Sequence, residues 1–294
     1  MATLRETKDR IASVRGTLKI TSAMKMIASS KLHKAQQAAA TTRAYRTALE
    51  DICSKLPWPS GQVSSDVDTN LPVAIVAFAS DSSLCGAFNS NIIRVAAEEI
   101  KRAGAGVKIF AVGRKMAEAL AKQFPEAGDV AAPISPESDY DSVSAFADSL
   151  AAAYNVGEYS RIVLVYNHFV SAASQKPLVE DFLPLAQSGP SVQDQTRGSA
   201  GEIDSSTDDG LYLFEPAPEE LSAELLPKLI RLKLYSVCLD SYAAECAART
   251  LAMQLATDNA QDLLAELTLE YNKQRQYKIT AEILDLAAGA EATL

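Results

Sequence analysis

The chain has 294 residues, of which 48% are hydrophobic and 22% are charged, with a net charge of −9 at pH 7. This balance is typical of a folded globular protein and argues against disorder. The longest apolar run, from Pro72 to Ala79, is far shorter than the roughly 20 residues that cross a bilayer, so we expect no direct membrane insertion. The first ten residues carry charges where a secretory signal is apolar, so we expect a protein kept in the cytosol.

Charge is distributed unevenly along the chain. Residues 1–55 hold eleven lysines and arginines against four acidic residues, a balance of +7, which leaves −16 for the remainder. A basic helix could bind nucleic acid or anionic lipid, but these charges are spaced singly and lack interleaved aromatic residues. A solvated helix face or an acidic protein partner explains the pattern equally well, and we expect no nucleic-acid partner.

The two ends of the chain have the composition of long helices. All twelve prolines lie between Pro57 and Pro227, and only Gly16 and Gly289 of the thirteen glycines lie outside residues 61–210. Residues 2–56, with the single exception of Gly16, and about 228–288 therefore have the composition of uninterrupted helices. At about 1.5 Å per residue such helices are roughly 80 and 90 Å long, more than a domain of this size can cover. Each end needs a helical partner.

The first helix carries the seven-residue repeat of a coiled coil. Its two columns are Leu4, Ile11, Leu18, Lys25 and Leu32, and Thr7, Val14, Thr21, Ala28 and Ala35, with an apolar stripe of Ile20, Met24 and Ile27 beside them. The predicted seam of the last helix consists of Ala244, Ala248, Leu251, Leu255, Leu263, Leu267, Tyr277, Ala281 and Leu284. We predict that the two ends pair as a long antiparallel coiled coil.

Between the helical ends the pattern alternates between strands and helices. Strands are predicted at 73–78, 107–112 and 161–166, and helices at 92–103, 116–124 and 139–154. This order predicts a Rossmann-like βαβ domain with a mostly parallel sheet, so the fold class is α/β. Residues 187–209 predict a loop and residues 211–216 an edge strand, after which Ser222 and Pro227 open the last helix. The expected parts are 1–56, 57–218 and 219–294.

One candidate for enzyme chemistry is Cys85, in a turn between a buried strand and a helix. A thiol nucleophile needs a base, and the chain offers only His33 and His168. A small Cys-Gly turn that packs the helix onto the sheet explains the same residues more simply. The sequence contains no CxxC, GxGxxG, GxxxxGK[ST] or HExxH motif, so we expect no catalytic site, metal or cofactor.

Three segments resemble the gamma subunit of F-type ATP synthases, the central rotor shaft. Residues 20–32, ITSAMKMIASSKL, are similar to the N-terminal signature of that family. Residues 245–260, ECAARTLAMQLATDNA, and residues 267–290 are similar to its C-terminal signature. The turn SSLCGAFNSN is similar to a strand–helix turn of the family, and the motifs occur in the right order along the whole chain.

The resemblance implies a non-catalytic central-stalk subunit of a proton-translocating F-type ATP synthase. Its coiled coil would rotate inside a ring of alternating alpha and beta subunits, while its body sits on the c-ring and contacts the epsilon subunit. Proton flow would be coupled to ATP synthesis or hydrolysis by conformational change. The location implied is the cytoplasmic face of the bacterial inner membrane, with the matrix side of the mitochondrial inner membrane as the alternative.

The resemblance also implies which residues contact partners. Positions of the signatures that would contact the alpha and beta ring are Met24, Lys25, Met26, Lys31, Glu270, Asn272, Arg275, Gln276 and Thr280. Tyr212 and Glu215 would form the foot that meets the c-ring and epsilon. Two other classes stay open on the residues alone, a cysteine-dependent hydrolase and a coiled-coil adaptor unrelated to ATP synthesis.

Overall fold

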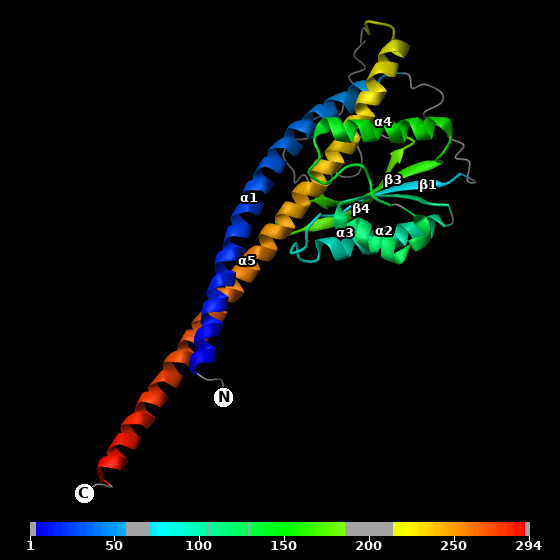
Figure 1. The fold of residues 1–294 in the computed structure, drawn as a ribbon. Coiled ribbons are helices and arrows are strands. Elements are labelled where there is room, and N and C mark those ends of the chain that lie inside the picture. Colours follow the sequence, from blue (N-terminus) through cyan, green and yellow to red (C-terminus); the bar gives the residue numbers. More distant parts are fainter. Residues whose placement is uncertain (1–3, 57–70, 105, 129, 186–213, 292–294) are drawn as a thin grey trace.

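The computed structural model describes residues 4–56, 71–104, 106–128, 130–185 and 214–291. Two long helices, α1 (Leu4–Ser54) and α5 (Pro218–Glu291), lie side by side and form a rod, with an α/β body against one half of it (Figure 1). At about 1.5 Å per residue they are roughly 77 and 110 Å long. The free end of α5 extends well past the N-terminus of α1 (Figure 1).

The body is built on one four-stranded sheet in the order β2-β1-β3-β4. The strands are β1 (Val73–Phe78), β2 (Lys108–Val112), β3 (Arg161–Phe169) and β4 (Gln175–Leu183). The first three are parallel and β4 pairs antiparallel with β3, which confirms the predicted mostly parallel sheet. β4 was not predicted, because its sequence QKPLVEDFL carries charges and Pro177, and proline in a strand is confined to sheet edges.

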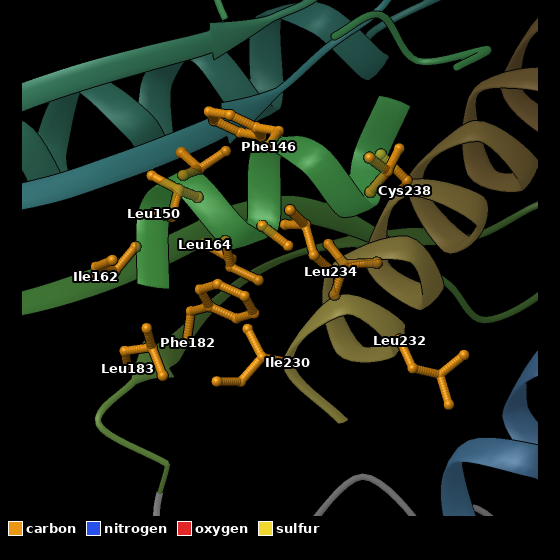
Figure 2. Packing of buried hydrophobic residues seen from close by; sticks show 14 of the residues in the cluster. Phe146, Leu150, Ile162, Leu164, Phe182, Leu183, Ile230, Leu232, Leu234 and Cys238 are labelled. Atoms are coloured by element: carbon orange, nitrogen blue, oxygen red, sulfur yellow. The ribbon is translucent and has the colours of Figure 1, made fainter. Parts of the chain in front are cut away.

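Helices cover both faces of the sheet. α2 (Phe88–Ala103) and α3 (Arg114–Gln123), followed by a short 3-10 helix (Pro125–Ala127), lie on one face, and α4 (Tyr140–Val156) lies on the other (Figure 1). On the α4 face, Phe146 and Leu150 meet Leu164 of β3, Phe182 of β4, and Ile230 and Leu234 of α5 (Figure 2). The first part of α5 is therefore a core helix of the body.

The seven-residue repeat of α1 persists along the whole helix. Its fully buried positions are Thr7, Thr21, Ala28, Ala35, Leu49 and Cys53. Leu4, Ile11, Leu18, Lys25 and Leu32 of the other column are partly buried. Side chains join the two helices at Thr7–Gln274, Thr21–Thr257 and Arg46–Ser236, which confirms the antiparallel pairing.

The prediction for α5 was wrong in two respects. The helix begins at Pro218, and Pro227 lies inside it rather than at its start. At Pro227, burial of the neighbouring Leu226 and Leu229 offsets the cost of a proline inside a helix. Of the predicted seam only Ala244, Ala248 and Leu267 are buried, whereas Leu251, Leu255, Leu263, Tyr277, Ala281 and Leu284 are exposed. The positions that face α1 are Met253, Thr257, Ala260, Leu264, Leu267, Tyr271 and Gln274.

This error has a physical cause. The prediction followed large apolar residues, but the seam of α5 contains polar Thr257 and Gln274, which hydrogen-bond to threonines of α1. Of the predicted edge strand at 211–216, only Phe214, Glu215 and Pro216 are described, and they form no strand. Residues 211–213 and the predicted loop at 187–209 lie outside the described residues. In the described segments, no helix is long and apolar enough to cross a membrane.

Candidate functional site

The N-terminal signature forms an apolar surface on α1 beside the coiled-coil seam. Ile20, Met24, Met26 and Ile27 are 60%, 38%, 73% and 59% exposed. Lys25 occupies a seam position and is partly buried. A run of exposed large apolar side chains is typical of a surface that contacts a partner. Among the described residues, neither the body nor α5 buries these four apolar side chains.

The C-terminal signature lies further along the rod. Its predicted contact residues Glu270, Asn272, Arg275, Gln276 and Thr280 are all exposed on α5. Beside them, Tyr277, Ile279, Ile283, Leu284 and Leu286 form an exposed apolar tip beyond Gln274, which pairs with Thr7 near the start of α1. Thr257 pairs with Thr21, near Met24, and Glu270 is 13 residues further on, so about 20 Å separates the two surfaces. They are two sites at different levels of the rod.

Lys31 differs from the other predicted ring contacts. Its Nζ lies 2.6 Å from Oε1 of Glu137, in the segment before α4, and both side chains are about half exposed. The Lys31 hydrogen bond, with a second from Tyr242, holds the pKa of the Glu137 carboxyl below its usual value, against the effect of burial. Lys31 therefore has a partner within its own chain.

The two predicted foot residues are only partly placed. Tyr212 lies outside the described residues. Glu215 is exposed and directly precedes α5 at the end of the rod opposite to the apolar tip.

The geometry around Cys85 does not resemble that of a thiol nucleophile. Its Sγ is buried and accepts a hydrogen bond from Nδ2 of Asn89 at 3.2 Å. The predicted base, His168, instead lies with Nδ1 2.6 Å from Oδ2 of Asp240 on α5. Phe169 packs against the cluster that contains Cys85, and successive strand residues point to opposite faces, so the His168 side chain is directed away from the thiol.

A contact that the sequence did not predict joins the body to α5. Arg249 donates to the carbonyl oxygens of Ser82 and Ser83 in the loop after β1, and it pairs with Oε1 of Glu245 at 2.6 Å. Burial raises the pKa of Glu245, although Arg249 acts in the opposite direction. The spacing of four residues between Glu245 and Arg249 was the available signal, since such residues are neighbours on a helix.

The same stretch of α5 is enclosed on all sides. The six consecutive residues 243–248 are all buried, whereas a helix in a two-stranded coil buries two positions in seven. Ala244 and Ala248 pack against Cys85 in the loop after β1, Phe88 at the start of α2 and Phe169 at the end of β3. In open α/β sheets that crevice is where ligands commonly bind. Here α5 fills it.

A family model described as ATP synthase matches residues 3–293. The ATP synthase gamma chain of Phocaeicola vulgatus is 43% identical, over 99% of this chain and 100% of that protein. The gamma chain of Flavobacterium johnsoniae is 40% identical, over 99% of both chains. The chain belongs to the ATP synthase gamma-chain family.

Solved structures agree at the level of the fold. A chain in the mitochondrial ATP synthase of Euglena gracilis aligns with a TM-score of 0.65 and 21% identity, covering 99% of this chain and 94% of that one. A chain in the central stalk and c-ring structure of the Tetrahymena thermophila enzyme aligns with a TM-score of 0.56 and 24% identity, covering 81% and 99%. The predicted membership of the gamma-subunit family is confirmed by the relatives, and the solved structures agree with the fold.

Membership of the gamma-chain family decides between the three classes that the residues left open. The match extends over nearly the whole chain, so it includes the body as well as the rod. A cysteine-dependent hydrolase and an unrelated coiled-coil adaptor therefore no longer account for the sequence.

Proposed function

We propose that this gamma-family chain is the rotating shaft that couples proton flow to ATP synthesis or hydrolysis, with no active site of its own. The observation that carries the proposal is that most of the predicted contact residues in the two signatures are exposed beside the seam that joins α1 and α5. In this proposal the rod stands inside a ring of alpha and beta subunits. Its rotation presents different faces to each subunit in turn and so biases their conformations.

The proposed ring contacts form two levels. Met24, Lys25 and Met26 would meet the ring at the upper level, and Lys31 would do so with the exposed part of its side chain. Glu270, Asn272, Arg275, Gln276 and Thr280 would meet it near the tip. The exposed basic side chains of α1, such as Arg10, Arg15 and Lys19, suit acidic surfaces on the ring.

In this proposal the c-ring turns the shaft at the end that carries the body. Tyr212 and Glu215 are proposed to contact the c-ring and the epsilon subunit, and the position of Glu215 at the end of the rod opposite to the tip supports this for Glu215. We further propose a peripheral location on the cytoplasmic face of the bacterial inner membrane. The similarity to bacterial gamma chains favours this over the mitochondrial alternative.

Reconstitution tests the proposal directly. The purified chain is mixed with the alpha and beta subunits of its own complex, and ATP hydrolysis and rotation of a bead attached to the body are measured. We expect assembly and rotation, with no hydrolysis by the chain alone. The variant Cys85→Ala should behave like the wild type, whereas a hydrolase would lose its activity. Failure of the chain to assemble or to rotate would overturn the proposal.

The upper contact surface is tested by substitution at Met24 and Lys25. Lys25→Ala should reduce ATP-driven proton pumping by no more than roughly fivefold, because exposed charge pairs contribute about 0–1 kcal/mol. Met24→Glu should reduce pumping more, since it places a charge on an apolar contact surface, and Met24→Leu serves as the matched apolar control. Normal pumping in both Lys25→Ala and Met24→Glu would contradict the assignment of this surface.

A further inference from the structure

Glu137 is the residue at which three parts of the molecule meet. It lies in the body, in the segment before α4. Its Oε1 accepts a hydrogen bond from Nζ of Lys31 on α1, with an N–O distance of 2.6 Å. The hydroxyl of Tyr242 from α5 lies near enough to this carboxylate to lower its pKa as well. One body side chain therefore bridges both helices of the shaft.

The contacts of Glu137 with the two helices lie at the level of the rod where the body stops covering α5. Beside Tyr242, residues 243–248 of α5 are buried on every side. From Met253 onward only every third or fourth residue is buried, which is the pattern of two helices with solvent around them. Glu137 thus belongs to the last contacts of the body before the free coiled coil.

Helix α1 has few other links to the body. Leu49 and Cys53 are the fully buried residues that α1 contributes to the core shared with α4 and the sheet. The nearer of them, Leu49, is 18 residues, or about 27 Å, from Lys31. Arg46 bonds to Ser236 of α5, not to the sheet. Among the ion pairs of the described residues, Lys31–Glu137 is the one that joins α1 to the body.

We propose that Glu137 is a positioning residue that ties α1 to the body at this level and thereby sets the point from which the two helices are free to twist. Without the tie, α1 would be held here only through its seam with α5, and the flexible part of the rod would begin closer to the core that contains Leu49. The proposal rests on the proposed function, because the twisting matters only in a shaft that transmits torque. Loss of a half-exposed pair should leave the fold intact.

The chain offers a matched control. Arg231 of α5 and Asp148 of α4 form another half-exposed ion pair between shaft and body, also with an N–O distance of 2.6 Å. Arg231 lies within the part of α5 that the body core covers, near the buried Ile230 and Leu232. Asp148→Asn therefore removes a pair of the same kind without touching α1.

Hydrogen exchange of the isolated full chain tests the proposal. Glu137→Gln should raise amide exchange in residues 25–35 of α1 several-fold, and Asp148→Asn should leave that segment unchanged. Lys31→Glu and Glu137→Lys should each raise exchange, whereas the double exchange of charges should restore protection. Equal exchange in Glu137→Gln and Asp148→Asn, or a double variant no better than the single ones, would overturn the proposal.

A second measurement uses the assembled complex. Glu137→Gln should widen the angular fluctuations of a bead on the body while the shaft tip is held by the ring, with the rate of ATP hydrolysis unchanged. Unchanged fluctuations would refute the positioning role. Because the exchange experiment needs no ring, its outcome is independent of whether the chain rotates, and loss of rotation in the wild type would count against the proposed function instead.

Discussion

The carboxylate of Glu245 is buried within the contact between body and shaft, and burial raises its pKa despite the neighbouring Arg249. A carboxyl with a raised pKa in the folded state favours folding most below its unfolded pKa of about 4.3, and this contribution is lost as the pH rises through the folded pKa. We therefore predict that Glu245→Gln gains thermal stability relative to the wild type between pH 4 and pH 7.5. Thermal unfolding at the two pH values measures this, and a relative stability that falls with rising pH would contradict it.

Glu137 provides the comparison of opposite sign. Its pKa is lowered, first by the hydrogen bond from Lys31 and then by that from Tyr242. Its interactions therefore stabilise the fold above the unfolded pKa of about 4.3 and are lost as the pH falls through the lower folded pKa. We predict that Glu137→Gln is less stable than the wild type at pH 7.5 and approaches it at pH 3. Because the side chain is half exposed, the effect should be small, and a deficit that persists undiminished at pH 3 would refute it.

At the scale of residues, the sequence predicted which side chains of α1 are exposed better than it predicted which distant residues pair with each other. Ile20 and Met24 could be placed outside the seam because they fall off the heptad positions of α1. The pairing of Lys31 with Glu137 could not be predicted, since 106 residues separate them and no local pattern links a helix to a distant loop. The same holds for Arg249, whose partners are backbone carbonyls after β1.

At the scale of elements, the repeat of α1 could be predicted because α5 is the main neighbour of this helix along its whole length. Helix α5 packs against two neighbours. Residues from Leu226 to Ala248 pack against the body, and residues from Met253 to Gln274 pack against α1 alone. Its apolar residues therefore follow no single period, and the predicted seam was largely wrong. The parallel strands were predicted because each is a short apolar run. Strand β4 mixes charged and apolar residues without a regular alternation and lies at a sheet edge.

The hydroxyls of Thr21 and Thr257 form a buried hydrogen bond between the two helices of the coiled coil, with an O–O distance of 3.0 Å. Each also contacts a carbonyl oxygen of its own helix, at Leu18 and Met253. We predict that Thr21→Val and Thr257→Val each reduce the free energy of unfolding by about 1 kcal/mol, and that the double variant loses less than their sum, because replacing both partners leaves no unpaired hydroxyl. Denaturant unfolding of the four chains measures the coupling. Strict additivity would show that the two hydroxyls do not interact.

At the scale of the whole molecule, the shaft passes through three surroundings in turn. The body encloses α5 up to Ala248, α1 covers one side of it as far as Gln274, and beyond that residue no described part of the chain covers it. The number of buried residues per turn falls at each step. Local stability follows buried contacts, so resistance to opening should fall in the same order from body to tip.

The tip gives the sharpest test of this order. Residues 275–286 are exposed and include Tyr277, Ile283 and Leu286, apolar side chains without a covering element in the described structure. An isolated helix of this length is only marginally stable in water. We predict rapid amide exchange of this segment in the free chain and strong protection after assembly with the alpha and beta ring, while residues 230–248 exchange slowly in both. A tip that is already protected in the free chain would show that its helix is stable without the ring, and a tip that stays unprotected in the assembly would remove it from the contact surface.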